Sequence, residues 1–231
     1  MTANNLLADF FSLIYPRICF ACGKGLYKQE KCLCAFCRYH LPKTNYHLEE
    51  DNPLSRLFWG RVNLGAAAAY YHFDKGSKVQ HLIHNLKYHG HQEIGTMIGT
   101  NYGIDLKNSP LYRDVDAVLP VPLHPKKQKR RGYNQSESFA RGIASALGAN
   151  CITDGLFRAF NSSSQTLRSR FERWKNVETI FGLYHKDSLQ GKHLLLVDDV
   201  VTTGATLEAC AQVLLGVPGA RVSVATIACA A

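Results

Sequence analysis

The spacing of hydrophobic residues divides the first half of the chain into distinct segments. An apolar stripe at helical spacing precedes Pro16 and predicts a short N-terminal helix that ends there. Residues 42–60 form a polar, acidic connector that contains proline. After it, the pattern of 65–73 predicts a strand, and 77–88 predicts an amphipathic helix. A second helix is expected over 91–103.

The second half of the chain alternates apolar strands with helices. Short apolar runs predict strands over 115–121, 194–197 and 222–228. Helices are expected over 135–147 and 206–215. This alternation predicts an α/β fold with a parallel sheet flanked by helices, in which ligands bind at the carboxyl ends of the strands.

Composition narrows the class of protein further. The chain has 231 residues, of which 46% are hydrophobic and 19% charged, so a disordered chain is excluded. The formal net charge is +9, which favours anionic partners such as phosphates, nucleic acids or acidic surfaces. Five of the positive charges lie within 126–131, in the loop expected after the strand at 115–121. Although such a run is often a solvated loop, its place after a strand favours contact with an anion.

Membrane and export signals are not apparent in the pattern. The longest apolar stretch, 64–71, is far too short to span a bilayer, and the N-terminal residues lack the basic start of an export signal. We therefore expect a cytoplasmic protein without a membrane span. In a reducing compartment, the eight cysteines are expected to be metal ligands or buried thiols rather than disulfides.

Two CxxC pairs lie close together near the N-terminus. Cys19-Phe-Ala-Cys22 and Cys34-Ala-Phe-Cys37 are separated by eleven residues. Two such pairs complete a tetrahedral S4 site, so Cys19, Cys22, Cys34 and Cys37 are predicted to bind a structural Zn²⁺. Cys32 is a fifth candidate that does not fit the spacing, and a set of free thiols is the alternative. A module this small depends on the metal for its folding energy.

The surface of this cysteine module is open to two interpretations. Basic and aromatic residues alternate along it: Lys24, Lys28, Lys31, Arg38, Phe20, Tyr27, Phe36 and Tyr39. Aromatic rings can stack on bases while cations neutralise the backbone, which favours binding of a single nucleic-acid strand. A solvated surface on a structural module explains the same pattern equally well. Similarly, His81 and His84 could bind a metal, but a polar helix face is the simpler interpretation.

The most specific pattern is Leu-Leu-Leu-Val-Asp-Asp-Val-Val-Thr-Thr-Gly-Ala-Thr over 194–206. An apolar strand brings Asp198 and Asp199 to its carboxyl end, and a hydroxyl- and glycine-rich turn leads into a helix. Backbone N–H groups, threonine hydroxyls and the helix dipole together form a phosphate site over 202–206. The two carboxylates repel phosphate but can accept hydrogen bonds from a sugar diol, so a phosphorylated ribose suits both parts. A P-loop is excluded because no Gly-Lys-Ser/Thr follows.

These residues resemble the phosphoribosyl pyrophosphate (PRPP) signature of type I phosphoribosyltransferases. Further motifs resemble the ComF/GntX-type competence proteins in the same order along the chain. They are the CxxC module, Asn-Leu-Lys-Tyr-His-Gly at 85–90, Leu-Pro-Val-Pro-Leu at 119–123, Arg-Gly-Tyr-Asn-Gln at 131–135, and the Gln-Thr-Leu…Arg-Trp-Lys-Asn…Phe pattern over 165–181. The resemblance runs from about residue 5 to the C-terminus.

The resemblance implies a role for each motif. It implies a type I phosphoribosyltransferase-like fold, with Asp198 and Asp199 binding the ribose hydroxyls. The residues implied for the 5′-phosphate are Thr202, Thr203, Gly204, Ala205 and Thr206. Those implied for the diphosphate, together with Mg²⁺, are Lys127, Arg130, Arg131, Arg170 and Arg173. Residues 162–176 would form a flap over the site, and Lys87 would lie in a hood region that selects the acceptor.

Three regions and two candidate functions follow. Residues 1–45 would form the N-terminal helix and zinc module, 46–110 the connector and hood, and 111–231 the phosphoribosyltransferase-like domain. The first function is a PRPP-binding protein that handles single-stranded DNA in natural competence, with single-stranded DNA and competence or DNA-translocation proteins as partners. The alternative is an active Mg²⁺-dependent, amidophosphoribosyltransferase-like enzyme acting on an unidentified nitrogen acceptor. No catalytic base is identified from the sequence.

Overall fold

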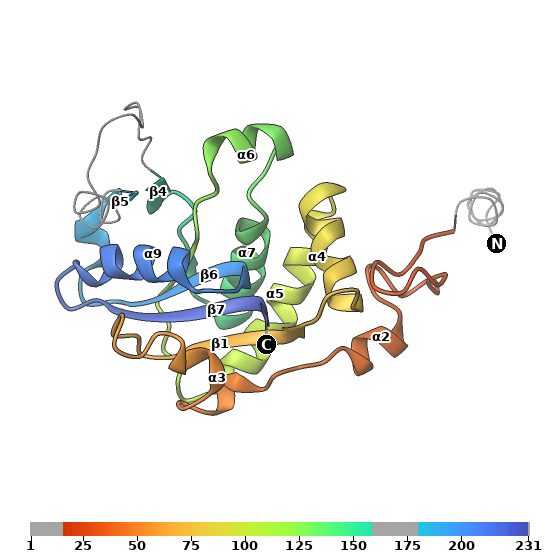
Figure 1. The fold of residues 1–231 in the computed structure, drawn as a ribbon, viewed down its shortest axis with the longest axis horizontal. Coiled ribbons are helices and arrows are strands. Elements are labelled where there is room, and N and C mark those ends of the chain that lie inside the picture. The colour runs from red at the N-terminus through yellow and green to blue at the C-terminus, as the bar shows by residue number, and fades with distance from the viewer. Residues whose placement is uncertain (1–15, 159–179, 231) are drawn as a thin grey trace.

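A five-stranded parallel sheet forms the centre of the computed structural model, which describes residues 16–158 and 180–230 (Figure 1). In spatial order its strands are β1 (Ala67–Phe73), β7 (Arg221–Ala230), β6 (His193–Val201), β2 (Ala117–Pro120) and β3 (Asn150–Cys151). All four neighbouring pairs are parallel. The predicted α/β class with a parallel sheet is therefore confirmed. The N-terminal helix expected before Pro16 and the flap expected at 162–176 lie outside the described residues.

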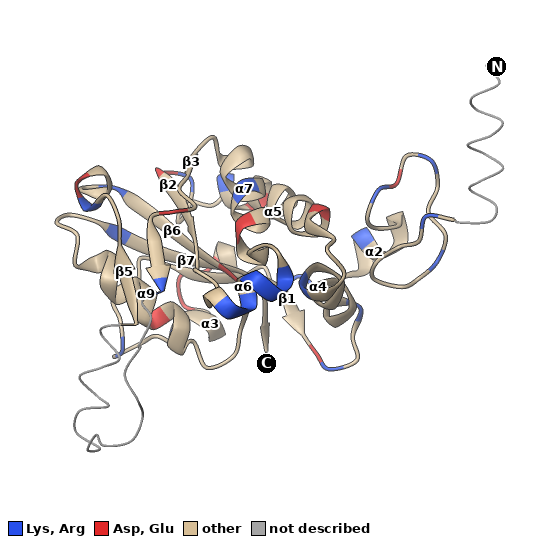
Figure 2. Cartoon of the chain, turned by 90° about the horizontal axis from the view of Figure 1, so that it is seen from above, with Lys and Arg blue, Asp and Glu red and all other residues tan. Residues whose placement is uncertain are grey.

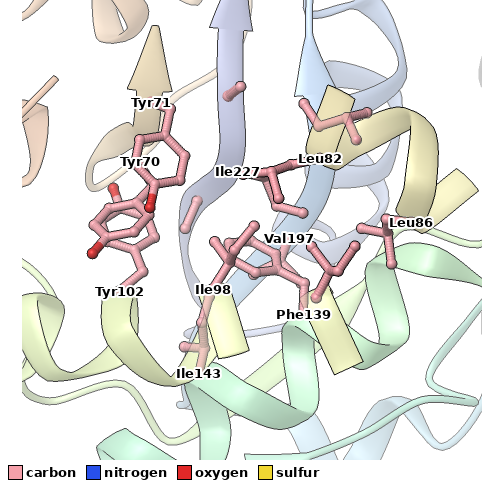
Figure 3. Close-up of a cluster of buried hydrophobic side chains, with 14 of the residues drawn as sticks. Tyr70, Tyr71, Leu82, Leu86, Ile98, Tyr102, Phe139, Ile143, Val197 and Ile227 are labelled. Atoms are coloured by element: carbon pink, nitrogen blue, oxygen red, sulfur yellow. The ribbon is translucent and has the colours of Figure 1, made fainter. Parts of the chain in front are cut away.

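Helices cover both faces of this sheet. One face carries α4 (Lys78–Tyr88), α5 (Gln92–Lys107) and α7 (Gln135–Leu147), and the other carries α3 (Pro53–Arg56) and α9 (Ala205–Leu215). Figure 3 shows side chains of the first face, including Leu82, Ile98, Phe139 and Val197, packed together. Along β6, Leu195 and Val197 face this cluster, whereas Leu194 and Leu196 face the cluster beneath α9. A strand buried on both faces needs the unbroken apolar run found in the sequence.

Helices α5 and α7 approach each other unusually closely. Gly95, Gly99 and Gly103 recur at every fourth position of α5 and lie against α7. A Cβ atom at Gly99 would collide with the carbonyl oxygen of Phe139. The helix also continues to Lys107, four residues beyond its expected end. The absence of side chains at these positions therefore allows the two backbones to touch.

The basic run at 126–131 was expected to be a loop, and that expectation is wrong. These residues belong to a short helix, α6 (Pro125–Arg131), which stands at the carboxyl end of the sheet (Figure 1). Pro125 occupies the first turn, where its missing N–H is not needed, and the His124 side chain accepts a hydrogen bond from the Lys126 N–H (3.2 Å). Gly132 ends the helix with a φ of +86°. Local capping thus overcomes the repulsion between neighbouring positive charges.

Several shorter elements complete the fold. The expected connector contains the 3₁₀ turn η1 (Tyr46–Leu48) in addition to α3, and a second 3₁₀ turn, η3, covers Lys186–Leu189. Strands β4 (Leu156–Arg158) and β5 (Phe181–Leu183) form a separate antiparallel pair. Because β1 pairs with β7, residues 46–110 supply an edge strand and two helices to the same core as residues 111–231.

The cysteine module lies at one end of the molecule and contains the helix α2 (Ala35–His40) (Figure 1). Ala21, Cys37 and Leu41 are buried and belong to the same hydrophobic cluster as α4 and α5. The module therefore packs on the main core. Within the described ranges, no helix combines the length and the apolar character needed to cross a bilayer.

Candidate functional site

Asp198 lies at the carboxyl end of β6, where the strand leaves the core. The structure leaves it half-buried, and its Oδ1 accepts hydrogen bonds from the Ser136 hydroxyl and the Asp199 N–H, both at 2.8 Å. Burial and the adjacent Asp199 carboxylate raise the pKa of Asp198 to about 7. This side chain therefore changes its protonation state near neutral pH.

Asp199 is more deeply buried and is held by two donors from different helices. Lys87 Nζ, near the end of α4, lies 2.8 Å from Asp199 Oδ1. The side-chain amide of Gln135, at the start of α7, donates to Oδ2. Both carboxylate oxygens are therefore paired, as a buried charge requires. The resemblance implied a role for Lys87 in a hood region, and the structure places it directly on the acidic pair.

The turn after β6 forms a small hollow of about 50 Å³ lined by residues 202–206. Gly204 has a φ of +74° and is the N-cap of α9, without a side-chain capping hydrogen bond. A Cβ atom there would lie 2.9 Å from the Phe58 ring. The first backbone N–H groups of α9 have no side-chain cap, so the hollow has the features of an anion site.

Segments outside the turn fix its shape. The guanidinium of Arg61 donates to the carbonyl oxygen of Thr203 at 3.1 Å and forms an ion pair with Glu208 in the first turn of α9. Leu57 and Phe58 pack against Gly204. Leu57 and Phe58 of the expected connector, together with the adjacent Arg61, therefore support the turn at 202–206.

A larger pocket of about 240 Å³ adjoins the acidic pair. Four cationic side chains line it: Lys87, Lys127, Arg131 and Arg158. Figure 2 shows α6 as a mostly blue segment beside α4, because most residues of α6 are Lys or Arg. Asp198 and Thr206 line both the pocket and the hollow, so the two spaces are neighbours. One region of the surface thus combines three kinds of group. The two carboxylates can accept hydrogen bonds from hydroxyls, the start of α9 can donate to one anion, and the four cations of the pocket can bind a second anion.

The predicted diphosphate residues divide into three groups. Lys127 and Arg131 line the pocket. Arg130 lies on α6 but is not part of the lining. Arg170 and Arg173 lie outside the described residues. Sequence reasoning missed Arg158, which belongs to the short strand β4.

The Arg-Gly-Tyr-Asn-Gln motif and the serine after it explain how the site is assembled. Tyr133 donates its hydroxyl hydrogen to the Leu86 carbonyl oxygen and so ties α7 to α4. Asn134 caps α7 and donates to the Val121 carbonyl oxygen at 3.0 Å. Gln135 and Ser136 then reach the two carboxylates. Sequence reasoning quoted this motif as part of a resemblance but did not identify Gln135 or Ser136 as site residues.

The four predicted metal ligands also come together. One ligand atom from each of Cys19, Cys22, Cys34 and Cys37 lies within 4.8 Å of the others. Cys22 Sγ and Cys34 Sγ are 3.8 Å apart, which is about the edge of a tetrahedron with Zn–S bonds of about 2.3 Å. A backbone hydrogen bond from Lys24 lowers the pKa of Cys22 to about 7, whereas burial raises the pKa values of Cys34 and Cys37, so a metal would have to displace the protons of these two thiols. The cluster could therefore hold a metal such as zinc.

Cys32 is buried but does not belong to this cluster. His81 Nδ1 lies 3.3 Å from the Ala21 carbonyl oxygen, so this histidine contacts the cysteine module. Among the described residues, the four cysteines are the group of metal-ligand type that converges, and His81 and His84 are not part of it. Helix α4 is thus in contact with both the cysteine module and the acidic pair.

The fold and the site together define a class of protein. Residues 113–230 match the family model described as the phosphoribosyl transferase domain, and the chain belongs to this family. Three curated relatives give its position within the family. The chain is 29% identical over 211 residues to the DNA utilization protein YhgH of Escherichia coli K12, which covers 90% of this chain and 88% of the relative.

The other two relatives are competence proteins. The chain is 25% identical over 201 residues to the competence protein ComFC of Bacillus subtilis, covering 86% of this chain and 78% of the relative. It is 31% identical over 111 residues to the competence protein F of Haemophilus influenzae, covering 48% of each chain. The predicted relation to the ComF-type competence proteins is confirmed.

Proposed function

We propose that the pocket and the adjoining hollow bind PRPP together with Mg²⁺. The ribose hydroxyls donate to Asp198 and Asp199, the 5′-phosphate occupies the turn at 202–206, and the diphosphate lies against α6. The observation that supports this best is the continuity of the carboxylate pair with the uncapped start of α9. Mg²⁺ bound with PRPP would offset part of the negative charge of the diphosphate.

The cations of the pocket suit a diphosphate better than a single phosphate. Lys127 and Arg131 come from adjacent turns of α6 and line the same pocket as Lys87. The guanidinium of Arg131 also stacks on Tyr88 with a centroid distance of 5.4 Å, which limits its freedom. We also propose Arg130, Arg170 and Arg173 as additional ligands of the diphosphate, a prediction made from the sequence.

We further propose that the protein handles single-stranded DNA during natural competence, in the cytoplasm and with DNA-translocation proteins as partners. Three aromatic rings of the cysteine module are exposed: Tyr27 (76%), Phe36 (58%) and Tyr39 (85%). Lys78 Nζ lies 5.1 Å from the centroid of Phe36, so a cation accompanies a ring. Exposed rings interleaved with cations are suited to stacking on bases. The printed names of the relatives, DNA utilization and competence proteins, agree with this role.

A transferase activity is the second candidate function. It is favoured by Asp198, whose pKa of about 7 suits proton transfer near neutral pH. In this reaction the C1–O bond breaks, diphosphate leaves with the electron pair, and a nitrogen nucleophile forms the C1–N bond and loses its proton. The cations of the pocket would stabilise the charge on the leaving diphosphate.

One set of binding measurements tests the two binding sites. Isothermal titration with PRPP and Mg²⁺, and separately with an oligothymidine strand, is applied to wild type, Asp198→Asn/Asp199→Asn and Tyr27→Ala/Tyr39→Ala. We expect the first variant to lose PRPP binding and keep DNA binding, and the second to do the reverse. Failure of the wild type to bind PRPP at millimolar concentration would refute the proposed PRPP site.

The contribution of α6 to DNA binding is tested by salt dependence. If Lys127, Arg130 and Arg131 contact the DNA backbone, their replacement by alanine reduces the slope of log K against log[salt] by about 0.7 per lost contact with a single strand. An unchanged slope would show that these residues of α6 do not contact DNA, and their proposed role would then be limited to binding PRPP. Transferase activity is tested by Mg²⁺-dependent release of diphosphate from PRPP with ammonia as the nucleophile.

A further inference from the structure

Lys87 connects the acidic pair with the cationic side of the pocket. Its Nζ lies 2.8 Å from Asp199 Oδ1, and the two side chains are only 22% and 6% exposed. Lys87 also lines the pocket together with Lys127 and Arg131. The ammonium group therefore pairs with the proposed diol acceptor in the same pocket as the cations proposed to bind the diphosphate.

The backbone that carries Lys87 is fixed on both sides. The Tyr133 hydroxyl donates to the carbonyl oxygen of Leu86, the residue before Lys87. Two residues before Lys87, Asn85 Nδ2 donates to the carbonyl oxygen of Phe20 in the cysteine module at 3.2 Å. Because α4 is held at these points, a ligand that displaces the ammonium from Asp199 moves the Lys87 side chain and not the helix.

We infer that Lys87 is a specificity-determining residue that selects sugar phosphates with an anionic group at C1. This inference rests on the proposed function and extends it. A ribose diol that donates to Asp199 takes the place of the Lys87 ammonium, which then needs a new anion because it is largely enclosed. A diphosphate at C1 supplies that anion in the same pocket. Ribose 5-phosphate binds the same carboxylate but leaves the ammonium without a partner.

This role differs from a general attraction between Lys87 and any phosphorylated ligand. A general attraction would favour PRPP and ribose 5-phosphate alike, because both carry the 5′-phosphate. A selecting residue instead acts on the two ligands in opposite directions. Removing the charge of Lys87 weakens the binding of PRPP, whose diphosphate pairs with the ammonium. It does not weaken the binding of ribose 5-phosphate, which displaces the ammonium from Asp199 without offering it a new anion.

The experiment compares dissociation constants for PRPP and ribose 5-phosphate, each with Mg²⁺, by isothermal titration of the full chain. The variants are Lys87→Met, which removes the charge at similar length, Lys87→Arg, which keeps it, and Lys126→Met as the control. Lys126 lies on α6 next to Lys127 but does not line the pocket. The expected result for Lys87→Met is PRPP binding weakened by at least about tenfold, with ribose 5-phosphate binding unchanged or tighter. Lys87→Arg and Lys126→Met should keep most of the preference for PRPP.

Each other outcome overturns a defined part of this reasoning. If Lys87→Met weakens both ligands by the same factor, or neither, Lys87 does not select and the proposed PRPP site stands. If the wild type binds neither ligand, the proposed function and the inference both fail. If Lys87→Met does not fold, as judged by its thermal transition, Lys87→Gln takes its place, and an unchanged preference in that variant refutes the inference.

Discussion

The environment of Asp198 allows a prediction about the free energy of unfolding of the protein without any ligand. Replacing Asp198 by asparagine keeps the shape of the side chain and an acceptor for the Ser136 hydroxyl and the Asp199 N–H. It removes a carboxylate that the folded protein disfavours, since its pKa rises from 3.8 to about 7 on folding. We therefore expect Asp198→Asn to abolish PRPP binding and to stabilise the protein at alkaline pH.

The size and sign of the effect follow from proton linkage. A rise of about 3 pKa units corresponds to at most about 4 kcal/mol. Because Asp198 is half-buried and solvent screens part of this cost, about 1–3 kcal/mol is expected, or roughly 2–10 °C in melting temperature. Between the unfolded pKa and about pH 7 the folded protein binds more protons than the unfolded chain, so wild-type stability falls relative to the variant as pH rises through this window.

The assay is thermal unfolding of wild type, Asp198→Asn and the surface control Asp74→Asn at pH 4, 5, 6, 7 and 8. The difference in melting temperature between Asp198→Asn and wild type should be small at pH 4, grow to about pH 7 and then level off. Asp74 is exposed, so its variant should follow wild type throughout. A destabilised Asp198→Asn at pH 8, or a difference independent of pH, would refute the argument from burial and charge.

Three further predictions concern other parts of the molecule. Gly99→Ala should lower stability by about 1–3 kcal/mol in chemical denaturation, because its methyl group meets the Phe139 carbonyl oxygen; an unchanged midpoint would contradict close packing of α5 on α7. Cys37→Ser, or treatment with a strong chelator, should unfold the cysteine module and release zinc detectable by a chromogenic dye; metal-free wild type with an unchanged melting temperature would contradict a structural metal. Burial lowers the pKa of His193, so wild-type stability should fall below about pH 6.5 relative to His193→Asn, and parallel pH profiles of the two would refute this.

The parts of the fold predicted from the sequence are those encoded locally. Strand β6 and helix α9 follow from a continuous apolar run, an acidic pair and a glycine-containing turn within one short segment, and the structure confirms this order. The two CxxC pairs are equally local, and their four sulfur atoms converge as expected. In contrast, β3 has two residues and β4 three, which is too short for periodicity to reveal.

The candidate site was predicted less completely than the fold, because the partners of its two carboxylates come from distant parts of the sequence. Asp198 and Asp199 were identified as acceptors, yet their partners Lys87, Gln135 and Ser136 lie 62 to 112 residues away in sequence. No local pattern states which helix end will meet a given strand end. The resemblance placed Lys87 in a variable hood, whereas the packing of α4 places it on Asp199.

Helix α4 gives a physical reason for joining a cysteine module to this site. Its buried face packs on the sheet, Asn85 and His81 contact backbone carbonyl oxygens of the module, and Lys87 reaches Asp199. If a bound metal supplies folding energy to the module, its loss would therefore affect the position of the ammonium that pairs with Asp199. Since Asn85 and Lys87 are two residues apart on the same helix, a shift of the module is transmitted through a single rigid element. The cysteine module thus contacts the helix that reaches the proposed sugar-phosphate site, in addition to having an exposed aromatic surface.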